Sequence, residues 1–191
     1  MTRQARAALL ALLGTAAPLA AQAPVVPSTG ISGTLSFDAR ATLGEFTGTT
    51  TRLAGQITGG PGLETIRGWV EAPVDSIRTG NRLRDRDMRR ALESDAHPHI
   101  RFDLAEIRPS PIQGREMVAT LVGRFTIHGT SRDVTLPATL TWGPDGIRLR
   151  ALLPMDVRDY GITRLSKLLG TLRMHPDIVV RIDLLVSQIP P

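Results

Sequence analysis

The side chains best suited to do chemistry lie in three short polar clusters, of which the first is a pair of histidines. His97 and His99 flank Pro98, and two imidazoles on one side of a strand could hold a metal ion. No third ligand follows at a suitable spacing, and a proline directly before a strand commonly marks the start of that strand. The sequence therefore predicts no metal site.

The other two clusters are rich in arginine. Arg158-Asp159-Tyr160 ends a long alternating segment, where a guanidinium and a phenol could meet a polar headgroup or phosphate at a cavity mouth. The simpler interpretation of that cluster is an ion pair at the end of a strand. Residues 84–90 hold four arginines and two aspartates, which is typical of a solvated helix face, although such arginines could also attract an anionic membrane.

Motifs of the common enzyme classes are absent from the sequence. The chain has no cysteine, no G-x-S-x-G or H-E-x-x-H motif, and no glycine-rich loop for phosphate. Ser76 has no base directed toward it by any motif. We therefore expect no catalytic residues, and a small periplasmic enzyme remains the alternative.

Composition favours one globular domain and argues against a nucleic-acid reader. The 191 residues are 41% hydrophobic and 21% charged, with a net charge of +5. Aromatic residues make up only 4% of the chain, so the platforms on which single-stranded nucleic acids stack are scarce.

The N-terminus has the pattern of a secretory signal peptide. Arg3 and Arg6 precede an apolar run, and small residues near Ala21 and Ala23 offer two cleavage sites. An uncleaved anchor is the alternative, but the run is shorter than the ~20 apolar residues that a span needs. We predict a signal peptide over 1–23, a linker over 24–30, a domain over 31–189, a periplasmic or secreted location, and no integral membrane span in the mature chain.

Beyond the linker, apolar and polar residues alternate with period 2, which indicates strands with one apolar face. Short turns containing Gly or Pro separate most of these segments. The alternation predicts eight strands, at residues 31–40, 47–58, 66–77, 99–108, 117–128, 134–142, 147–158 and 178–186.

Two short helices complete the expected elements. Asn81 is suited to cap a helix over 82–94, in which Met88, Ala91 and Leu92 share one side. A second short helix is expected over 163–169.

Long antiparallel strands either stack as a sandwich or close as a barrel, and their length favours a barrel. An eight-stranded barrel has room for one small ligand inside. A membrane-spanning barrel would need an apolar outer face, whereas charged residues stand opposite the aliphatic face at Arg124, Arg148, Arg150, Arg181 and Asp183. The predicted fold class is therefore all-β, an eight-stranded antiparallel β-barrel with its apolar face inside and one or two short helices.

Five segments in order resemble the YceI-like lipid/polyisoprenoid-binding family. They are residues 76–81 (SIRTGN), 84–88 (RDRDM), 97–102 (HPHIRF), 123–132 (GRFTIHGTSR) and 158–162 (RDYGI). The resemblance implies an exported, lipocalin-like β-barrel whose interior takes a polyisoprenoid chain, such as that of a quinone or a prenyl phosphate. It implies no other cofactor.

The inward-facing residues agree with a lipid cavity. They are aliphatic and include small residues at Ala119, Gly123, Ala138 and Ala151, so side chains could leave apolar space at the centre. The alternative is a filled core that acts through protein partners, and a homodimer is left open. The candidate ligand contacts are Phe102, Leu121, Phe125, Ile127, Leu140, Trp142, Leu153 and Ile182, with Arg158 and Tyr160 at the mouth.

Overall fold

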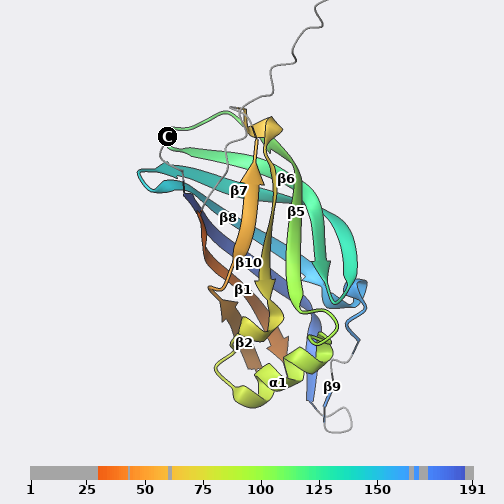
Figure 1. Ribbon diagram of the computed structural model, residues 1–191. Helices are drawn as coiled ribbons and strands as arrows, with labels where there is room; N and C mark the ends of the chain where they lie inside the picture. Colours follow the sequence, from red (N-terminus) through yellow and green to blue (C-terminus); the bar gives the residue numbers. More distant parts are fainter. Residues whose placement is uncertain (1–29, 43, 60–61, 164–165, 168–171, 188–191) are drawn as a thin grey trace, which may run out of the picture.

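Long strands with one apolar face build a strongly curled antiparallel sheet with one α-helix across its end (Figure 1). The computed structural model describes residues 30–42, 44–59, 62–163, 166–167 and 172–187. The expected signal peptide over 1–23 lies outside the described residues, as does all of the expected linker except Gly30. The curled antiparallel sheet confirms the predicted all-β fold class. It forms a half-barrel.

Nine strands follow one hydrogen-bonded path, in the order β2-β1-β10-β8-β7-β6-β5-β4-β3, and β9 pairs with β10. The strands are β1 (Gly30–Ala41), β2 (Gly44–Thr50), β3 (Ala54–Thr58), β4 (Arg67–Pro73), β5 (His99–Pro109), β6 (Glu116–Ile127), β7 (Thr130–Gly143), β8 (Gly146–Asp156), β9 (Ser166–Lys167) and β10 (Leu172–Ser187). The helices are α1 (Arg82–Ala91) and the 3-10 turns η1 (Leu63–Thr65), η2 (Val74–Ser76) and η3 (Val157–Tyr160).

The predicted alternation is confirmed most clearly in β6. Every second residue from Met117 to Ile127 is buried, and those between them are exposed or only partly buried. A two-residue turn at His128 and Gly129, with φ of 54° and 69°, joins β6 to β7. Positive φ at both central residues is typical of the type I′ turn, whose twist matches that of the flanking strands.

Several predicted elements differ from the structure. The expected strand over 47–58 is two strands, β2 and β3, which form opposite ends of the sheet. Together with β9, which was not expected as a strand, this gives the described chain ten strands rather than eight. The helix predicted over 82–94 ends at Ala91. The helix predicted over 163–169 is wrong where the chain is described, because Ser166 and Lys167 form a strand that pairs with β10.

The curl brings the two halves of the sheet together at β1 and β3, which lie in contact. Gly55 of β3 makes this approach close, since a Cβ there would lie 2.5 Å from Cδ1 of Ile31 and 2.6 Å from the carbonyl oxygen of Trp69. Glycine in a strand often marks such a close approach.

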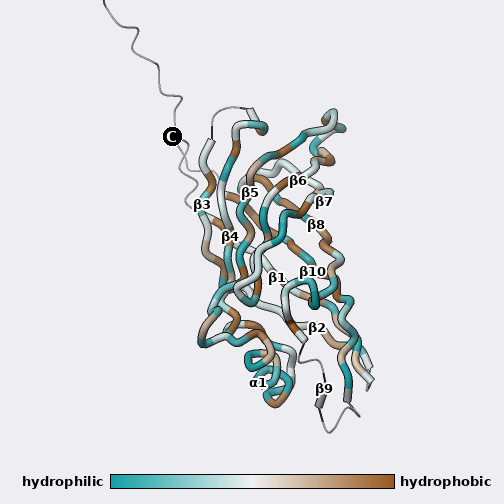
Figure 2. Tube along the Cα trace, turned by 90° about the vertical axis from the view of Figure 1, so that its right-hand side faces the viewer, coloured by the Kyte–Doolittle hydropathy of each residue, from teal (hydrophilic) through white to brown (hydrophobic). Residues whose placement is uncertain are grey.

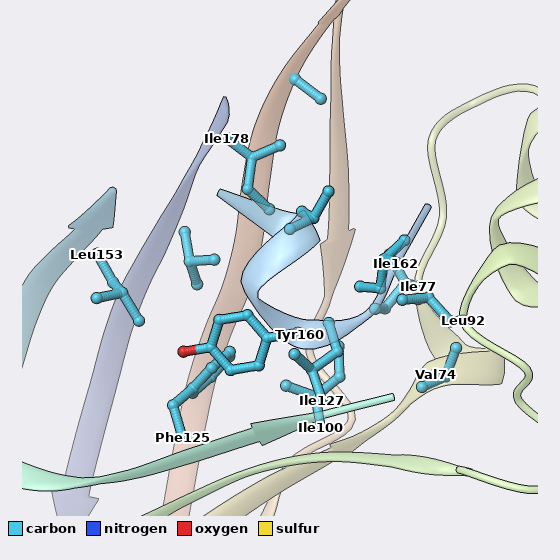
Figure 3. Packing of buried hydrophobic residues seen from close by; sticks show 13 residues of the cluster. Val74, Ile77, Leu92, Ile100, Phe125, Ile127, Leu153, Tyr160, Ile162 and Ile178 are labelled. Atoms are coloured by element: carbon cyan, nitrogen blue, oxygen red, sulfur yellow. The ribbon is translucent and has the colours of Figure 1, made fainter. Parts of the chain in front are cut away.

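Buried side chains form two clusters along the interior. The cluster at the α1 end includes Val74, Ile77, Leu92, Ile100, Phe125, Ile127, Leu153, Val157, Tyr160, Ile162, Ile178 and Val180 (Figure 3). The cluster toward the other end contains Ile107, Met117, Ala119, Leu121, Leu136, Ala138, Leu140 and Ala151.

The outer wall carries cross-strand ion pairs. Arg148 Nε lies 2.7 Å from the Asp183 carboxylate on the neighbouring strand, and Arg124 Nε lies 2.9 Å from that of Asp133. Hydrophilic and hydrophobic residues accordingly alternate along the strands in Figure 2. None of the described helices is long and apolar enough to cross a membrane.

Candidate ligand-binding cavity

An interior space lies beneath α1 and is called here the helix-end cavity. Its volume is about 330 Å³, at the lower end of the range for small-molecule sites. Apolar side chains from β1, β2, β6, β8, β10 and α1 form most of its wall. They include Leu35, Phe37, Phe46, Ile77, Met88, Leu92, Ile100, Phe125, Ile127, Met155, Val157, Met174, Ile178 and Val180.

Two polar side chains fix the start of α1, which borders this cavity. The Asn81 side chain caps the helix by accepting hydrogen bonds from the backbone N–H groups of Leu83 (2.9 Å) and Arg84 (3.1 Å). The buried Asp85 carboxylate accepts from the backbone N–H of Thr79 (2.9 Å) and from its hydroxyl (2.6 Å). Burial alone would raise the pKa of Asp85, but these bonds and the nearby arginines outweigh it and hold that pKa below its ordinary value.

An aromatic pair lines the cavity on the side of β1 and β2. The rings of Phe37 and Phe46 meet edge to face, with centroids 6.1 Å apart. Gly48 makes room for this pair, because a Cβ at that position would lie 2.2 Å from Cε1 of Phe37. The Arg84 guanidinium lies over the Phe46 ring, 4.2 Å from its centroid, so a cation–π contact ties α1 to β2.

A second space, called here the inner cavity, lies deeper in the barrel and has a volume of about 80 Å³. Leu35, Ile100 and Phe125 line both cavities, so these three side chains form the partition between them. The Tyr160 ring supports the partition by packing edge to face against Phe125, with centroids 5.8 Å apart (Figure 3).

The structure brings half of the ten sequence-predicted ligand residues to a cavity wall. Phe125 lines both cavities, Ile127 lines the helix-end cavity, and Phe102, Leu121 and Ile182 line the inner cavity. Leu140, Leu153 and Trp142 line neither and pack in the two core clusters instead.

Arg158 and Tyr160 are not at the cavity mouth. Arg158 is exposed and pairs with Asp156, with Nη2 and Oδ2 2.5 Å apart. Tyr160 is buried with 3% of its surface exposed, and this burial raises the pKa of its phenol. The ion-pair interpretation of residues 158–160 therefore fits the geometry better than a headgroup contact does. The partner of Arg158 is Asp156 rather than Asp159.

Of the two histidines that flank Pro98, His99 is exposed at the start of β5, and His97 packs in a corner near α1. His97 faces the turn residue His128, with ring centroids 5.5 Å apart, and a Cβ on Gly129 would lie 2.5 Å from the His97 ring. His128 Nδ1 donates to the carbonyl oxygen of Tyr160 (3.1 Å). Among the described residues, no group of three or more His, Cys, Asp or Glu side chains is arranged to hold a metal ion.

Sequence reasoning missed the part of the site that α1 and β2 supply. The sequence pattern puts Met88 and Ala91 on one side of the helix but does not indicate that this side faces the interior, where both residues line the cavity. Phe46 was missed because it precedes the strand that was predicted to begin at Thr47, whereas β2 begins at Gly44.

A family model described as the YceI-like domain matches residues 29–186. Among curated proteins, none matches the sequence.

Three solved structures are similar in fold. Burkholderia cenocepacia BcnA has 15% identity and a TM-score of 0.68, with 82% of this chain and 96% of that chain covered. A polyisoprenoid binding domain from Saccharophagus degradans, implicated in plant cell wall breakdown, has 14% identity and a TM-score of 0.67, with 86% and 97% covered. The Campylobacter jejuni YCEI protein has 19% identity and a TM-score of 0.59, with 75% and 85% covered.

Proposed function

This chain belongs to the YceI-like domain family, and from that premise we propose that it is an exported protein that binds a polyisoprenoid lipid inside its barrel. The ligand is of the isoprenoid quinone or prenyl phosphate type, and the protein acts as its carrier or scavenger. The proposal includes no chemistry on the ligand, and it includes removal of residues 1–23 on export.

The helix-end cavity is the observation that carries this proposal. It offers about 330 Å³ enclosed mainly by aliphatic and aromatic side chains, and such a space favours an apolar ligand. The fold similarity to a polyisoprenoid binding domain supports the ligand class.

Energetic considerations favour a long apolar chain over a small molecule. Burial of about 15 carbons contributes roughly 12 kcal/mol at about 0.8 kcal/mol for each methylene. Association costs of about 4–15 kcal/mol would offset much of that gain. A shorter chain would therefore be held weakly, so the ligand is expected to fill the cavity.

The headgroup is placed at the α1 end of the cavity in this proposal. Asn81, Arg84, Asp87 and Arg173 contribute to the wall there together with Thr42. The amide of Asn81 and the guanidiniums of Arg84 and Arg173 can donate to the oxygens of a quinone or a phosphate. This position replaces the one expected from Arg158 and Tyr160.

A cavity-filling variant tests the proposal. Ala91 lines the cavity from α1, so Ala91→Trp should occupy ligand space. Ala96→Trp is the matched control, because Ala96 is exposed beyond the end of the helix. Binding is measured by displacement of a fluorescent prenyl-chain probe with an isoprenoid quinone or a prenyl phosphate.

We expect Ala91→Trp to weaken binding at least about tenfold, because roughly two displaced methylenes suffice for that loss, and Ala96→Trp to bind as the unaltered protein does. Equal binding by both variants would refute the cavity as the site. Failure of the unaltered protein to bind either lipid would favour a barrel that acts through protein partners.

A further inference from the structure

The outward face of α1 carries a row of arginines that the proposed function does not use. Arg82, Arg86 and Arg90 follow one another at intervals of four residues, and all three are exposed. Residues four apart lie on the same face of a helix, so the three guanidiniums form one stripe. Among the ion pairs of the described residues, none includes a member of this stripe.

An exposed leucine stands beside the stripe. Leu83 has 62% of its surface exposed, the largest fraction among the exposed large hydrophobic residues of the described chain. It also lines the helix-end cavity, so it lies where the cavity wall meets the outside. After Asp87, the chain has no acidic residue until the helix has ended. The next two are Glu93 and Asp95.

Several arginines elsewhere on the surface differ from the stripe because they form ion pairs. Arg108, Arg124, Arg148 and Arg158 each lie within 3 Å of a carboxylate oxygen. A partner carboxylate largely cancels the field of such a side chain beyond the immediate neighbourhood. The stripe on α1 is thus a place on the molecule where exposed positive charge stands beside exposed apolar surface.

We propose that α1 docks the protein onto an anionic lipid surface, with the arginine stripe on the headgroups and Leu83 inserted between them. Helices that lie in a membrane interface combine basic residues with apolar side chains that reach the acyl boundary. Each basic residue near an anionic surface adds to the attraction. The proposal goes beyond ligand binding and does not depend on it.

The position of α1 in the fold suits this contact. The helix lies across one end of the sheet in both views of the molecule, at the same end as β9 (Figures 1 and 2), so a flat surface that approaches this end can contact α1. The α1 end of the cavity would then face the lipid headgroups. An acidic protein surface is the alternative partner for the arginine stripe. Binding to vesicles that contain no protein distinguishes a lipid partner from a protein partner.

Vesicle flotation tests the proposal with the mature protein. The vesicles contain phosphatidylcholine alone or with phosphatidylglycerol and no isoprenoid, so the result is independent of ligand binding. The test variants are a triple substitution, Arg82→Gln with Arg86→Gln and Arg90→Gln, and separately Leu83→Gln. The control triple, Arg108→Gln with Arg115→Gln and Arg150→Gln, removes the same charge from exposed positions far from α1.

We expect the unaltered protein to float with the anionic vesicles and not with the neutral ones at low salt. Loss of the stripe should lower the partition coefficient about tenfold to a hundredfold, Leu83→Gln should lower it severalfold, and the control triple should change it less than threefold. Binding should vanish near 1 M salt, where the screening length falls to about 3 Å. Absence of binding to anionic vesicles, or an equal loss in both triples, would overturn the proposal. Thermal unfolding of each variant verifies that the fold is retained.

Discussion

Single side chains determine which part of the interior is open. Ala119, Ala138 and Ala151 stand side by side in register on β6, β7 and β8, yet they line neither cavity. Their small size lets neighbouring residues pack closely in the second core cluster. Open space lies instead under α1, where Gly48 has no side chain that would collide with the ring of Phe37. Ala119, Ala138 and Ala151 therefore do not border open space, although in the sequence such small inward residues indicate a cavity.

The partition between the two cavities makes a testable prediction about ligand length. Leu35→Ala should join the helix-end and inner cavities and shift the preference of the protein toward longer isoprenoid chains, at a cost in stability of about 2 kcal/mol. The control is Leu149→Ala, which removes the same atoms from a residue that lines only the inner cavity. Competition between short and long prenyl chains measures the effect, and an unchanged length preference in Leu35→Ala would argue against the partition.

A glycine in β6 is predicted to be essential for stability. A Cβ at Gly123 would lie 2.3 Å from the carbonyl oxygen of Asp103 and 2.6 Å from the Phe102 ring. Gly123→Ala should lower the free energy of unfolding by about 1–3 kcal/mol, as overpacking does. At Gly143 the nearest atom to a new Cβ is 3.8 Å away, so Gly143→Ala should leave stability almost unchanged. Urea denaturation of the two variants makes the comparison.

At the scale of elements, α1 controls access to the helix-end cavity in this account. Asn81→Ala should remove the cap and destabilise the helix by about 1 kcal/mol. Release of a prenyl hydrocarbon, which has no headgroup for the Asn81 amide to bind, should then become faster, because α1 leaves the cavity more often. Asn81→Asp keeps a capping oxygen and should release this hydrocarbon at the original rate. Stopped-flow measurement of probe release is the test, and equal rates in all three proteins would contradict this role of α1.

The family-like segments hold neighbouring elements together and also contribute to the cavity wall. His128 of the segment 123–132 bonds to Tyr160 of the segment 158–162, and His97 packs on Gly129. Thr79 of the segment 76–81 anchors Asp85 of the segment 84–88. These segments therefore fix the corner near α1, and each of them also supplies wall residues to the helix-end cavity, among them Ile77, Met88, Ile100, Phe125 and Ile162.

The strands could be predicted from the sequence, but the edges of the sheet could not. Alternation placed both ends of β5, β6 and β8 to within two residues, because one face of these strands is buried. It placed the start of β7 four residues too late, at residue 134 instead of Thr130. The break between β2 and β3 left no signal, since Thr51, Arg52 and Leu53 suit a strand as well as a loop. Likewise, periodicity locates the apolar side of α1 but not the surface that this side covers, so half of the cavity wall was missed.

At the scale of the whole molecule, stability is predicted to fall in acid. The Thr47 hydroxyl and Arg181 hold the pKa of Asp38 below its ordinary value, and Arg148 does the same for Asp183. A carboxylate whose pKa is lower in the folded state contributes stability that is complete above the unfolded pKa, about 3.9. That contribution is lost as the pH falls through the folded value.

The melting temperature should accordingly stay nearly constant between about pH 5 and pH 8 and fall below about pH 4. Asp38→Asn should lower stability slightly at neutral pH and reduce the acid-induced loss, since exposed pairs contribute modestly. Thermal unfolding at constant ionic strength gives the profile. A melting temperature that rises as the pH falls from 5 to 3 would contradict the role of these carboxylates.

The binding of a polyisoprenoid inside the barrel is tested most directly by native mass spectrometry of the mature protein, purified without detergent from the periplasm of a host that makes isoprenoid lipids. Organic extraction then identifies whatever is released. The account predicts a stoichiometric adduct with a prenyl chain, which Ala91→Trp loses and Ala96→Trp keeps. Binding of a polyisoprenoid would be contradicted if the protein carried no co-purified lipid and also bound neither added isoprenoid quinones nor prenyl phosphates.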